Sequence, residues 1–313
     1  MHEAENRGIE VLGLDVNASQ VHCTVEASAG REGSGLGVRL GLGYIKDVVA
    51  DECRELVAER GRNGSFRSLG DLAARIGAGR RTLEQLAWSG ACDGLLGACD
   101  RRSALWGLGM AAAGQQAGEG TQLALGMELP AAPRLRSLGR WQRLIADYAT
   151  SGVTVGDHPM AVLRERLAVS GDHRSAGAAV ALASSTQLDR LPRGCEVAVA
   201  GLVIARQRPG TAKGTMFLLF EDEWGTINLI VPRAVYERYR QLARTEPLLL
   251  ARGRLERAEG VQNVIARELA ALERFLPGGL SEKAQAQVHE LEVGSSMRAV
   301  APPVQSFAMG RRR

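Results

Sequence analysis

The amino-acid sequence predicts an α+β fold in which short strands, short helices and a small β-barrel follow one another along the chain. Two patterns carry this prediction. Between residues 46 and 113, apolar residues recur at helical spacing, as in Val49, Cys53 and Leu56. Between residues 191 and 275 they instead form five β-prone runs with one helical run among them.

Composition limits the classes of protein to consider. The 313 residues allow two or three modest domains, and a net charge of +4 with a pI near 9.0 mildly favours an anionic partner. The five cysteines are scattered without a Cys-x-x-Cys pair, which argues against a disulfide framework or a cysteine zinc site. No apolar run approaches the roughly 18 residues of a membrane span, so we expect a cytoplasmic protein without a membrane partner.

The first two regions are expected to be strands and then short helices. Residues 1–45 hold β-prone runs separated by loops, and residues 46–113 hold short helical runs with tight turns. Ser68 and Asp71 have the spacing of a helix N-cap, and Thr82 begins the same pattern before the next helix. Short paired helices of this kind predict a helix-hairpin-helix-like domain.

Such hairpins bind DNA phosphates through free backbone amides at the turn and at the start of the following helix. Glycine normally lets the turn approach the phosphate, but the expected position here reads Asp47, Val48 and Val49. Asp47 also adds a negative charge. The pattern therefore leaves two interpretations open: a duplex-binding domain or a small packed helical domain.

Residues 114–190 are predicted to be a linker with short helices. The linker contains Gln122, Leu123 and Leu125, which match the start of the peptide that docks polymerases on a sliding clamp. Gly126 stands where that peptide usually has an aromatic anchor. We therefore expect weak or no contact with a sliding clamp.

Residues 191–275 have the order of an OB-fold, the five-stranded barrel that binds single strands. The strands read EVAVAGLVIARQ, TMFLLFE, TINLIVP, LLLARGRLER and GVQNVIARELAAL, with the helix PRAVYERYRQLA between the third and fourth. Closing the barrel would remove exposed sheet edges. Residues 276–313 are expected to form a C-terminal helix and a flexible tail.

Alternation along the second barrel strand divides its side chains between two faces. Met216, Leu218 and Phe220 share one face, which we expect to be the core, and Phe217 lies on the other. An exposed aromatic ring on this strand of an OB-fold can stack on a base. The alternative is that Phe217 belongs to the core.

Three cations lie in or beside the loop between the first two barrel strands: Arg206, Arg208 and Lys213. We expect them near the phosphates of a bound strand. Residues 193–274 hold 13 Lys and Arg against 10 Asp and Glu, a net +3, so most of the excess positive charge falls here. The alternative is that these cations are ordinary solvated surface.

The sequence contains no recognisable active site. No aspartate constellation suited to two-metal catalysis and no nucleophile–base pair is found, so we predict neither catalytic nor metal-binding residues. Glu221, Asp222 and Glu223 could suggest magnesium, but in a predicted hairpin turn we interpret them as a solvated tip.

Several segments together resemble the C-terminal region of bacterial family C DNA polymerases. These include LDVNASQVHCTVE, VRLGLGYIKDV, LEQLAWSGACDGL and VTVGDHPMAVLRERL. RQRPGTAKGTMFLLFEDEWGTINLIV is the most specific segment and is similar to the error-prone branch, which acts in translesion synthesis after DNA damage. The resemblance covers about residues 9 to 276 and marks the first 45 residues as the end of a fingers-like region.

The resemblance implies a DNA-binding function in DNA replication and repair, with duplex on the helical domain and single-stranded template on the barrel. It also implies that the catalytic palm, and the Mg²⁺ that the parent nucleotidyltransferase reaction needs, belong to polypeptide outside this chain. We therefore expect the chain alone to be inactive. Its expected partners are DNA, the missing polymerase half and accessory translesion proteins. Alternatives are a stand-alone single-strand-binding module or a decayed polymerase remnant.

Overall fold

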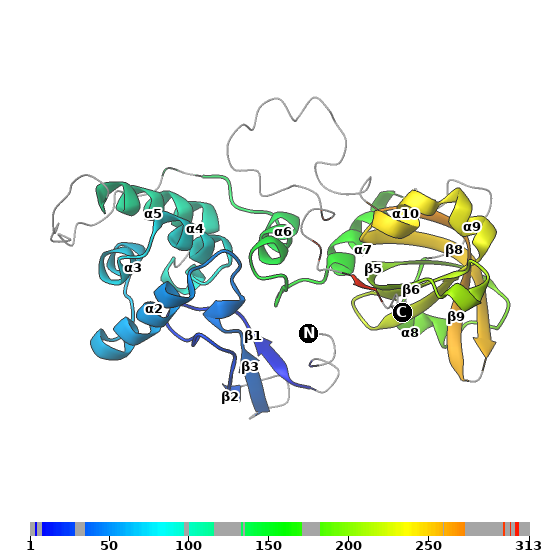
Figure 1. Cartoon of the computed structure of the whole chain (residues 1–313), viewed down its shortest axis with the longest axis horizontal. Coiled ribbons are helices and arrows are strands. Elements are labelled where there is room, and N and C mark those ends of the chain that lie inside the picture. Colours follow the sequence, from blue (N-terminus) through cyan, green and yellow to red (C-terminus); the bar gives the residue numbers. More distant parts are fainter. Residues whose placement is uncertain are drawn as a thin grey trace, which may run out of the picture. The chain divides into compact units, whose positions relative to one another are not determined.

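The structure is a computed structural model of the whole chain, which divides into two compact units, Met1–Gly156 and Asp157–Arg313 (Figure 1). It describes residues 8–28, 35–96, 100–115, 135–170, 182–258 and 260–272, and the single positions 4, 133, 297, 301 and 304–306. The predicted C-terminal helix and the clamp-like peptide lie outside the described residues. Among the described residues, no helix combines the length and the apolar character needed to cross a membrane.

The first unit begins with a three-stranded sheet in the order β1-β3-β2. Its strands are β1 (Glu10–Leu12), β2 (Thr24–Ser28) and β3 (Gly35–Arg39). The central strand β3 pairs parallel to β1 and antiparallel to β2. A short 3-10 turn, η1 (Leu42–Tyr44), then leads into the helices.

The helices of the first unit are α2 (Ala50–Asn63), α3 (Leu69–Ile76), α4 (Arg80–Trp88), α5 (Arg101–Gln115) and α6 (Arg140–Thr150), with the 3-10 turn η2 (Asp93–Leu95) before α5. The apolar faces of α2 to α5 meet in one core that contains Leu56, Leu72, Leu83 and Leu86. The helical periodicity read from the sequence is thus the periodicity of burial.

Of the two helix starts predicted from capping patterns, one is correct and one is wrong. Ser68 is the N-cap of α3, and its hydroxyl accepts a hydrogen bond of 3.1 Å from the Asp71 amide. The next helix, however, begins at Arg80: its N-cap is Gly79, three residues before the predicted cap, and Thr82 lies inside the helix. The Thr82 hydroxyl donates to the Glu52 carboxylate on α2, a partner that local spacing cannot reveal.

The second unit confirms the predicted OB-like barrel. It contains α7 (Pro159–Ser170), β4 (Leu182–Ala183), α8 (Ser185–Leu188), β5 (Glu196–Gln207), the 3-10 turn η4 (Gly210–Ala212), β6 (Met216–Glu221), β7 (Thr226–Val231), α9 (Arg233–Arg238), α10 (Arg240–Thr245), β8 (Leu248–Ala258), β9 (Val261–Ala271) and β10 (Gln305–Ser306). The barrel strands run in the order β5-β6-β7-β9-β8, and β8 pairs back onto β5 to close the cylinder. The predicted single helix between the third and fourth barrel strands is two helices that meet at Tyr239.

The long strand β5 closes the barrel because it takes part in two pairings. Its first half pairs with β8 and its second half with β6. Two glycines permit close approaches between barrel strands: a Cβ on Gly201 of β5 would lie 2.7 Å from Phe220 Cβ on β6, and one on Gly253 of β8 would lie 2.0 Å from the Ile265 carbonyl oxygen on β9. The barrel core includes Met216, Leu218 and Phe220, as the alternation predicted.

Candidate nucleic-acid interface

The outer face of β6 carries Phe217, which is half-buried rather than part of the core. In register beside it stand Gln207 on β5 and Ile230 on β7, and Ile230 in turn pairs with Ile265 on β9. A second row on the same face contains Ala205, Leu219, Asn228 and Asn263. On β5, β6, β7 and β9, the residues of the two rows are apolar apart from three amide side chains, and none of them is charged, which suits stacking of bases.

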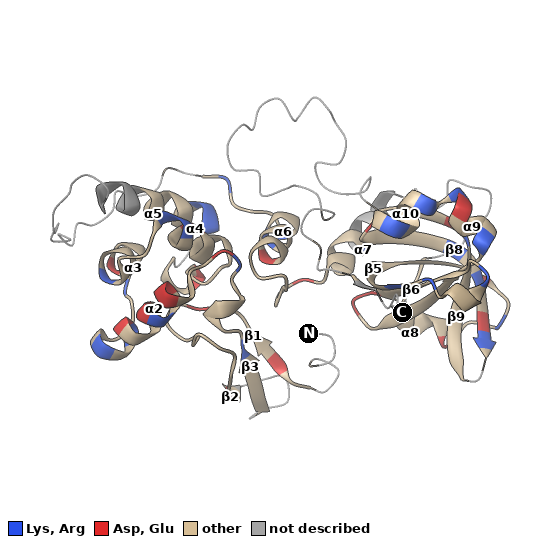
Figure 2. Cartoon of the chain, in the orientation of Figure 1, with Lys and Arg blue, Asp and Glu red and all other residues tan. Residues whose placement is uncertain are grey.

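Basic residues lie on α9 and α10, beside the loop that precedes β6 (Figure 2). Arg208 lies over the Tyr236 ring with its guanidinium carbon 4.4 Å from the ring centroid. Lys213 has a left-handed backbone (φ 49°). A Cβ added to the next residue, Gly214, would lie within 3.2 Å of the aliphatic stem of Arg233 on α9. The loop between β5 and β6 therefore lies against α9.

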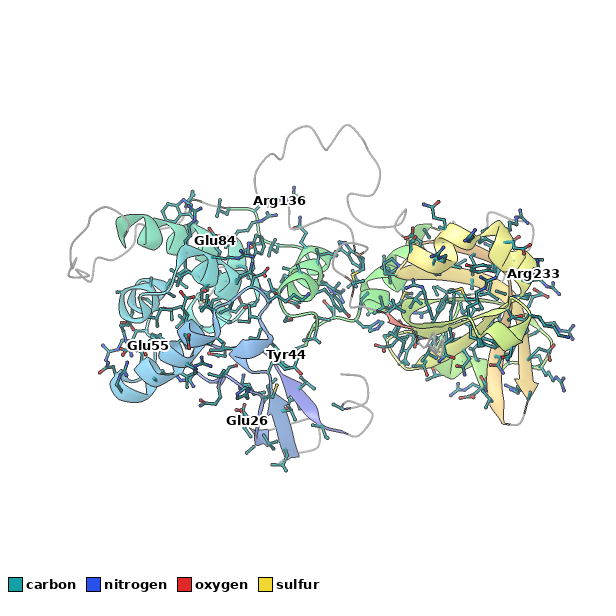
Figure 3. The ribbon with its side chains drawn as sticks, viewed as in Figure 1. Glu26, Tyr44, Glu55, Glu84, Arg136 and Arg233 are labelled. Atoms are coloured by element: carbon teal, nitrogen blue, oxygen red, sulfur yellow. The ribbon has the colours of Figure 1, made fainter. Side chains whose placement is uncertain are left out.

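Further exposed arginines on α9 and α10 extend this basic surface: Arg233, Arg238, Arg240 and Arg244. Arg233 forms an ion pair with Glu237 at 2.7 Å and, as Figure 3 shows, stands on the outside of the helix. These four residues were not predicted from the sequence. The sequence feature that could have indicated them is the run of arginines in the predicted helix directly after the third barrel strand.

Arg206 has a different contact from the other two predicted cations. Its Nε donates to the Ala243 carbonyl at 3.0 Å and its Nη2 to the Glu246 carbonyl, so the guanidinium binds the C-terminal end of α10. A cation is favourable there because the carbonyl end of a helix is partially negative. Burial lowers the pKa of Arg206. The side chain thus joins β5 to α10.

The acidic turn between β6 and β7 is not a solvated tip, contrary to the expectation from sequence. Asp222 is fully buried. One of its oxygens accepts from the Trp224 amide at 3.0 Å, the Gly225 amide at 2.9 Å and the Ser185 hydroxyl at 2.7 Å, and the other accepts from the Ser185 amide at 2.7 Å. Glu223 is held by Arg164. The cluster fixes the turn to the start of α8.

These contacts also test whether the acidic turn fits a magnesium ion. Mg²⁺ needs carboxylate oxygens with free lone pairs directed at one point. The Asp222 oxygens are already occupied by N–H and O–H donors, and Arg164 Nη2 lies 3.6 Å from one of them. Among the described residues, no group of three or more acidic, histidine or cysteine side chains could hold a metal. The turn does not fit the ion.

A glycine hairpin in the first unit was missed by the sequence analysis. Gly77, Ala78 and Gly79 connect α3 to α4, with Gly77 in the left-handed region (φ 55°). Ala78 is buried in the core, whereas Gly77 and Gly79 are exposed, so the backbone of the turn faces outward. The sequence I-G-A-G-R-R, an apolar residue before alternating glycines and then two arginines, was the available signal.

The earlier hairpin, between η1 and α2, also contains a residue in the left-handed region, although it has no glycine at that turn. Asp47 takes the left-handed region itself (φ 62°), which aspartate tolerates better than most residues. Its carboxylate forms an ion pair with Arg81 at 3.2 Å. The Tyr44 and Val49 side chains beside it are exposed (Figure 3 labels Tyr44).

The two hairpins are joined by an internal carboxylate. Glu52 on α2 accepts the Gly79 amide at 2.9 Å and also the Thr82 hydroxyl. A phosphate oxygen bound to this hairpin would use the same amide. The arginines that follow are also paired, because Arg80 contacts Glu84 at 2.7 Å and Arg81 contacts Asp47.

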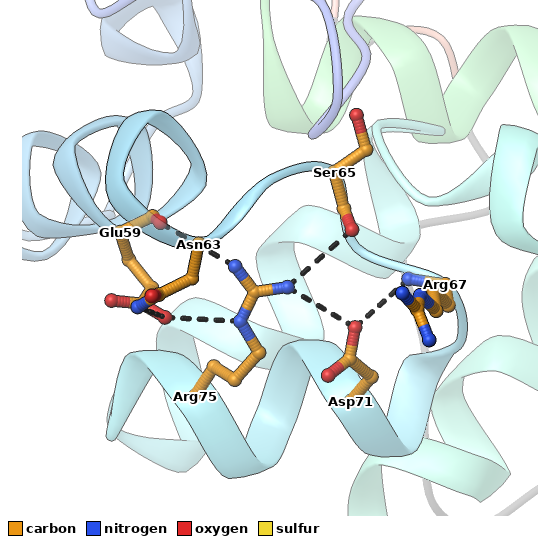
Figure 4. A pocket seen from close by; sticks show the side chains of 6 residues that line it. All are labelled: Glu59, Asn63, Ser65, Arg67, Asp71 and Arg75. Carbon is orange, nitrogen blue, oxygen red and sulfur yellow. Dashed lines mark hydrogen bonds and ion pairs between the residues drawn. The ribbon is translucent and has the colours of Figure 1, made fainter.

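A pocket of about 320 Å³ lies between α2 and α3 (Figure 4). Its central cation, Arg75, donates to the Glu59 carboxylate at 3.0 Å, to Asp71 at 3.2 Å and to the Gly64 carbonyl at 2.8 Å. It also stacks over the Phe66 ring at 4.5 Å. Since its donors are used within the protein, Arg75 serves to tie the two helices together.

The four cysteines among the described residues are free thiols. Cys53 and Cys92 are buried, and burial is the main reason that their pKa values are raised. A thiol with a raised pKa is protonated at neutral pH and is a poor nucleophile. Cys23 and Cys195 are likewise free thiols.

Comparison with known proteins now gives these surfaces a context. The family described as a helix-hairpin-helix motif matches residues 8–104. The error-prone DNA polymerase of Mycolicibacterium paratuberculosis is 38% identical over 272 residues, which are 86% of this chain and 23% of the relative. That of Pseudomonas savastanoi pv. phaseolicola is 36% identical over 282 residues, covering 89% of this chain and 25% of the relative.

The chain is homologous to a part of the error-prone DNA polymerases. It spans about a quarter of the length of the curated relatives that it matches. The helix-hairpin-helix match includes both the Asp47 turn and the Gly77–Gly79 turn and ends before the barrel begins. Among solved structures, an asparaginyl-tRNA synthetase from Pyrococcus horikoshii matches 33% of this chain and 26% of its own at 19% identity, and its TM-score of 0.26 is too low to indicate a shared function.

Proposed function

We propose that this chain is a DNA-binding region of an error-prone DNA polymerase, and that its barrel binds single-stranded template. The observation that carries the proposal is the outer face of β6, where the half-buried ring of Phe217 stands among apolar and amide side chains in a row without charge. Arg208 and Lys213 lie in the loop directly before this strand. Bases would stack on the ring and phosphates would pass the loop cations.

The helical unit would hold the duplex through its hairpin backbone. Support comes from the match to the helix-hairpin-helix motif and from the outward-facing glycines 77 and 79. Backbone amides recognise phosphate without reading sequence, as a polymerase requires behind its primer terminus. Translesion synthesis after DNA damage is the context in which we place the chain, with Mg²⁺ and the catalytic carboxylates supplied by other polypeptide.

Fluorescence anisotropy with a labelled single-stranded oligonucleotide tests the barrel assignment. We expect Phe217→Ala to weaken binding by about 1–3 kcal/mol, which is roughly 5- to 150-fold, because a stacked base loses its platform. Val261→Ala is the matched control, since Val261 is an exposed apolar residue of the same barrel outside the two rows. Equal affinities of the wild type and Phe217→Ala would contradict the proposal.

The reaction itself needs a separate assay. We expect the purified chain to incorporate no nucleotide in a primer-extension assay with Mg²⁺, because no carboxylate cluster suited to two metal ions was found in its sequence. Incorporation by the chain alone would overturn this part of the proposal.

A stand-alone single-strand-binding module is the second candidate. The barrel favours it, because the cylinder closes on itself around a core of its own. The two candidates differ in their expectation for duplex DNA: the polymerase region binds it through the first unit, and the stand-alone module does not.

A further inference from the structure

The three-stranded sheet of the first unit presents an apolar face. Val25 on β2 pairs with Val38 on β3, which pairs in turn with Val11 on β1, and Leu36 pairs with Ala27. Cross-strand partners point to the same side of a sheet, so these five side chains share one face. The opposite face carries the Arg39–Glu26 ion pair (Figure 3 labels Glu26).

This apolar face is not covered by the core of its unit. Val25 is 66% exposed and Leu36 is 67% exposed, and they are the two most exposed of the large hydrophobic residues among the described residues. None of the residues of β1, β2 or β3 belongs to either hydrophobic cluster that the described residues form. A small sheet needs its hydrophobic face packed for independent stability, so a covering surface is expected.

We propose that the apolar face of Val11, Val25, Ala27, Leu36 and Val38 is the docking surface for the rest of an error-prone DNA polymerase. The inference rests on the proposed function. The relatives extend over about three quarters of their length outside the matched region, and that polypeptide is large enough to supply a covering surface. The sheet is the part of the first unit that its own core leaves open to such packing.

The chemistry of the face defines the surface that would cover it. The five side chains carry no charge or hydrogen-bonding group, so their partner is an apolar strand or helix face rather than nucleic acid. The polar face with Arg39 and Glu26 is already satisfied internally, since Arg39 also donates to the Gly13 carbonyl at 3.0 Å. The partner therefore docks from one side.

Co-purification tests the docking surface. A tagged copy of the full chain is co-expressed with the Mycolicibacterium paratuberculosis error-prone polymerase from which the matched region has been removed. We expect a one-to-one complex, and at least about a tenfold loss of recovered partner with Val25→Glu/Leu36→Glu, because a carboxylate in an apolar interface is strongly disfavoured. Val261→Glu is the control, since Val261 is 47% exposed on the barrel and lies outside the face.

A second variant and two further measurements separate the possible failures. The glutamates could unfold the sheet instead of blocking the interface. Val25→Thr/Leu36→Thr keeps strand propensity, so it tests the interface in a folded sheet, and we expect it to weaken recovery of the partner as well. Hydrogen exchange at the β2 and β3 amides should slow in the complex. Single-strand binding should be unchanged in the Val25 and Leu36 variants, whereas absence of single-strand binding by the wild-type chain would count against the proposed function and not against the docking surface.

Three outcomes would overturn the docking proposal. The first is no complex with the wild-type chain. The second is equal recovery with wild type, Val25→Glu/Leu36→Glu and Val25→Thr/Leu36→Thr. The third is a dimer of the chain alone that the substitutions abolish, which would assign the face to a second copy.

Discussion

The two candidate DNA-binding surfaces treat charge in opposite ways. At the hairpins of the first unit, the exposed arginines are paired with carboxylates, as in Arg81 with Asp47 and Arg80 with Glu84. On the barrel, Arg233 is also paired, with Glu237, whereas Arg208 lies on an aromatic ring, and among the described residues neither Arg208 nor Lys213 forms an ion pair. The difference indicates that the hairpins would act through backbone amides, whereas the barrel would act through side chains.

A similar contrast separates two carboxylates that each bind a backbone amide at the start of a helix. Asp222 is fully buried and accepts four hydrogen bonds from the β6–β7 turn and from Ser185. Glu52 is half-buried and accepts the Gly79 amide and the Thr82 hydroxyl. The first carboxylate is structural, and the second occupies a position that a phosphate could take.

Replacing Asp222 should have the largest effect of the substitutions considered. Asp222→Ala leaves several buried donors without an acceptor, and we expect the free energy of unfolding to fall by about 3–5 kcal/mol. Urea denaturation followed by circular dichroism measures the change. Asp222→Asn keeps the shape and one acceptor oxygen and should cost less. A loss below about 1 kcal/mol for the alanine variant would show that the turn is not held by this side chain.

Arg206 lies beside the barrel loop with Arg208 and Lys213, but its guanidinium binds the end of α10. Its replacement therefore tests which cations of the barrel serve stability and which serve DNA binding. Arg206→Met keeps the aliphatic stem and removes the two hydrogen bonds to the end of α10. We expect a loss of about 1–3 kcal/mol in stability, as for hydrogen bonds of a charged group. Single-strand affinity should change less than about twofold, on the argument that the guanidinium contacts no phosphate. A large loss of affinity with unchanged stability would return Arg206 to the DNA surface.

The barrel cations predict a specific dependence on salt. With Arg208→Ala/Lys213→Ala, the slope of log affinity for single-stranded DNA against log salt should become shallower by about 1.4, because each neutralised phosphate contributes about 0.7. Anisotropy titrations between low and moderate salt give the slope. Arg193→Ala/Arg267→Ala is the control, since those exposed arginines lie elsewhere on the barrel and are paired with Glu256 and Glu196. An equal change of slope in both double variants would show that the barrel binds by net charge alone.

The barrel was predictable from sequence because its determinants are local. Strand alternation placed Met216, Leu218 and Phe220 inside and Phe217 outside, and the strand order identified the fold. The burial of Asp222 was not predictable in this way. It depends on Ser185, 37 residues earlier in the chain, arriving beside the turn.

The helical unit shows the same limit. The start of α3 followed from Ser68 and Asp71, which are neighbours in sequence, but the start of α4 did not follow from Thr82. The Thr82 hydroxyl is bound by Glu52, 30 residues earlier, and the glycine turn before it sets the helix start instead. The glycine turn at residues 77–79 was not predicted, because the sequence indicated the hairpin at Asp47. The start of α4 and the burial of Asp222 depend on contacts between distant segments rather than on local propensity, so the sequence pattern did not predict them.

The smallest expected effect concerns the carboxylate at the glycine hairpin. Glu52→Gln removes a negative charge beside the Gly79 amide while keeping the side-chain shape, so a DNA phosphate meets less repulsion and competition there. We expect duplex affinity to rise by about 2- to 5-fold, the size of a single charge effect of 0.3–1 kcal/mol at a helix start. Single-strand affinity at the barrel should not change, and Glu55→Gln on the exposed side of α2 is the matched control. An unchanged duplex affinity in Glu52→Gln would leave Glu52 as a helix cap and move duplex binding away from this hairpin.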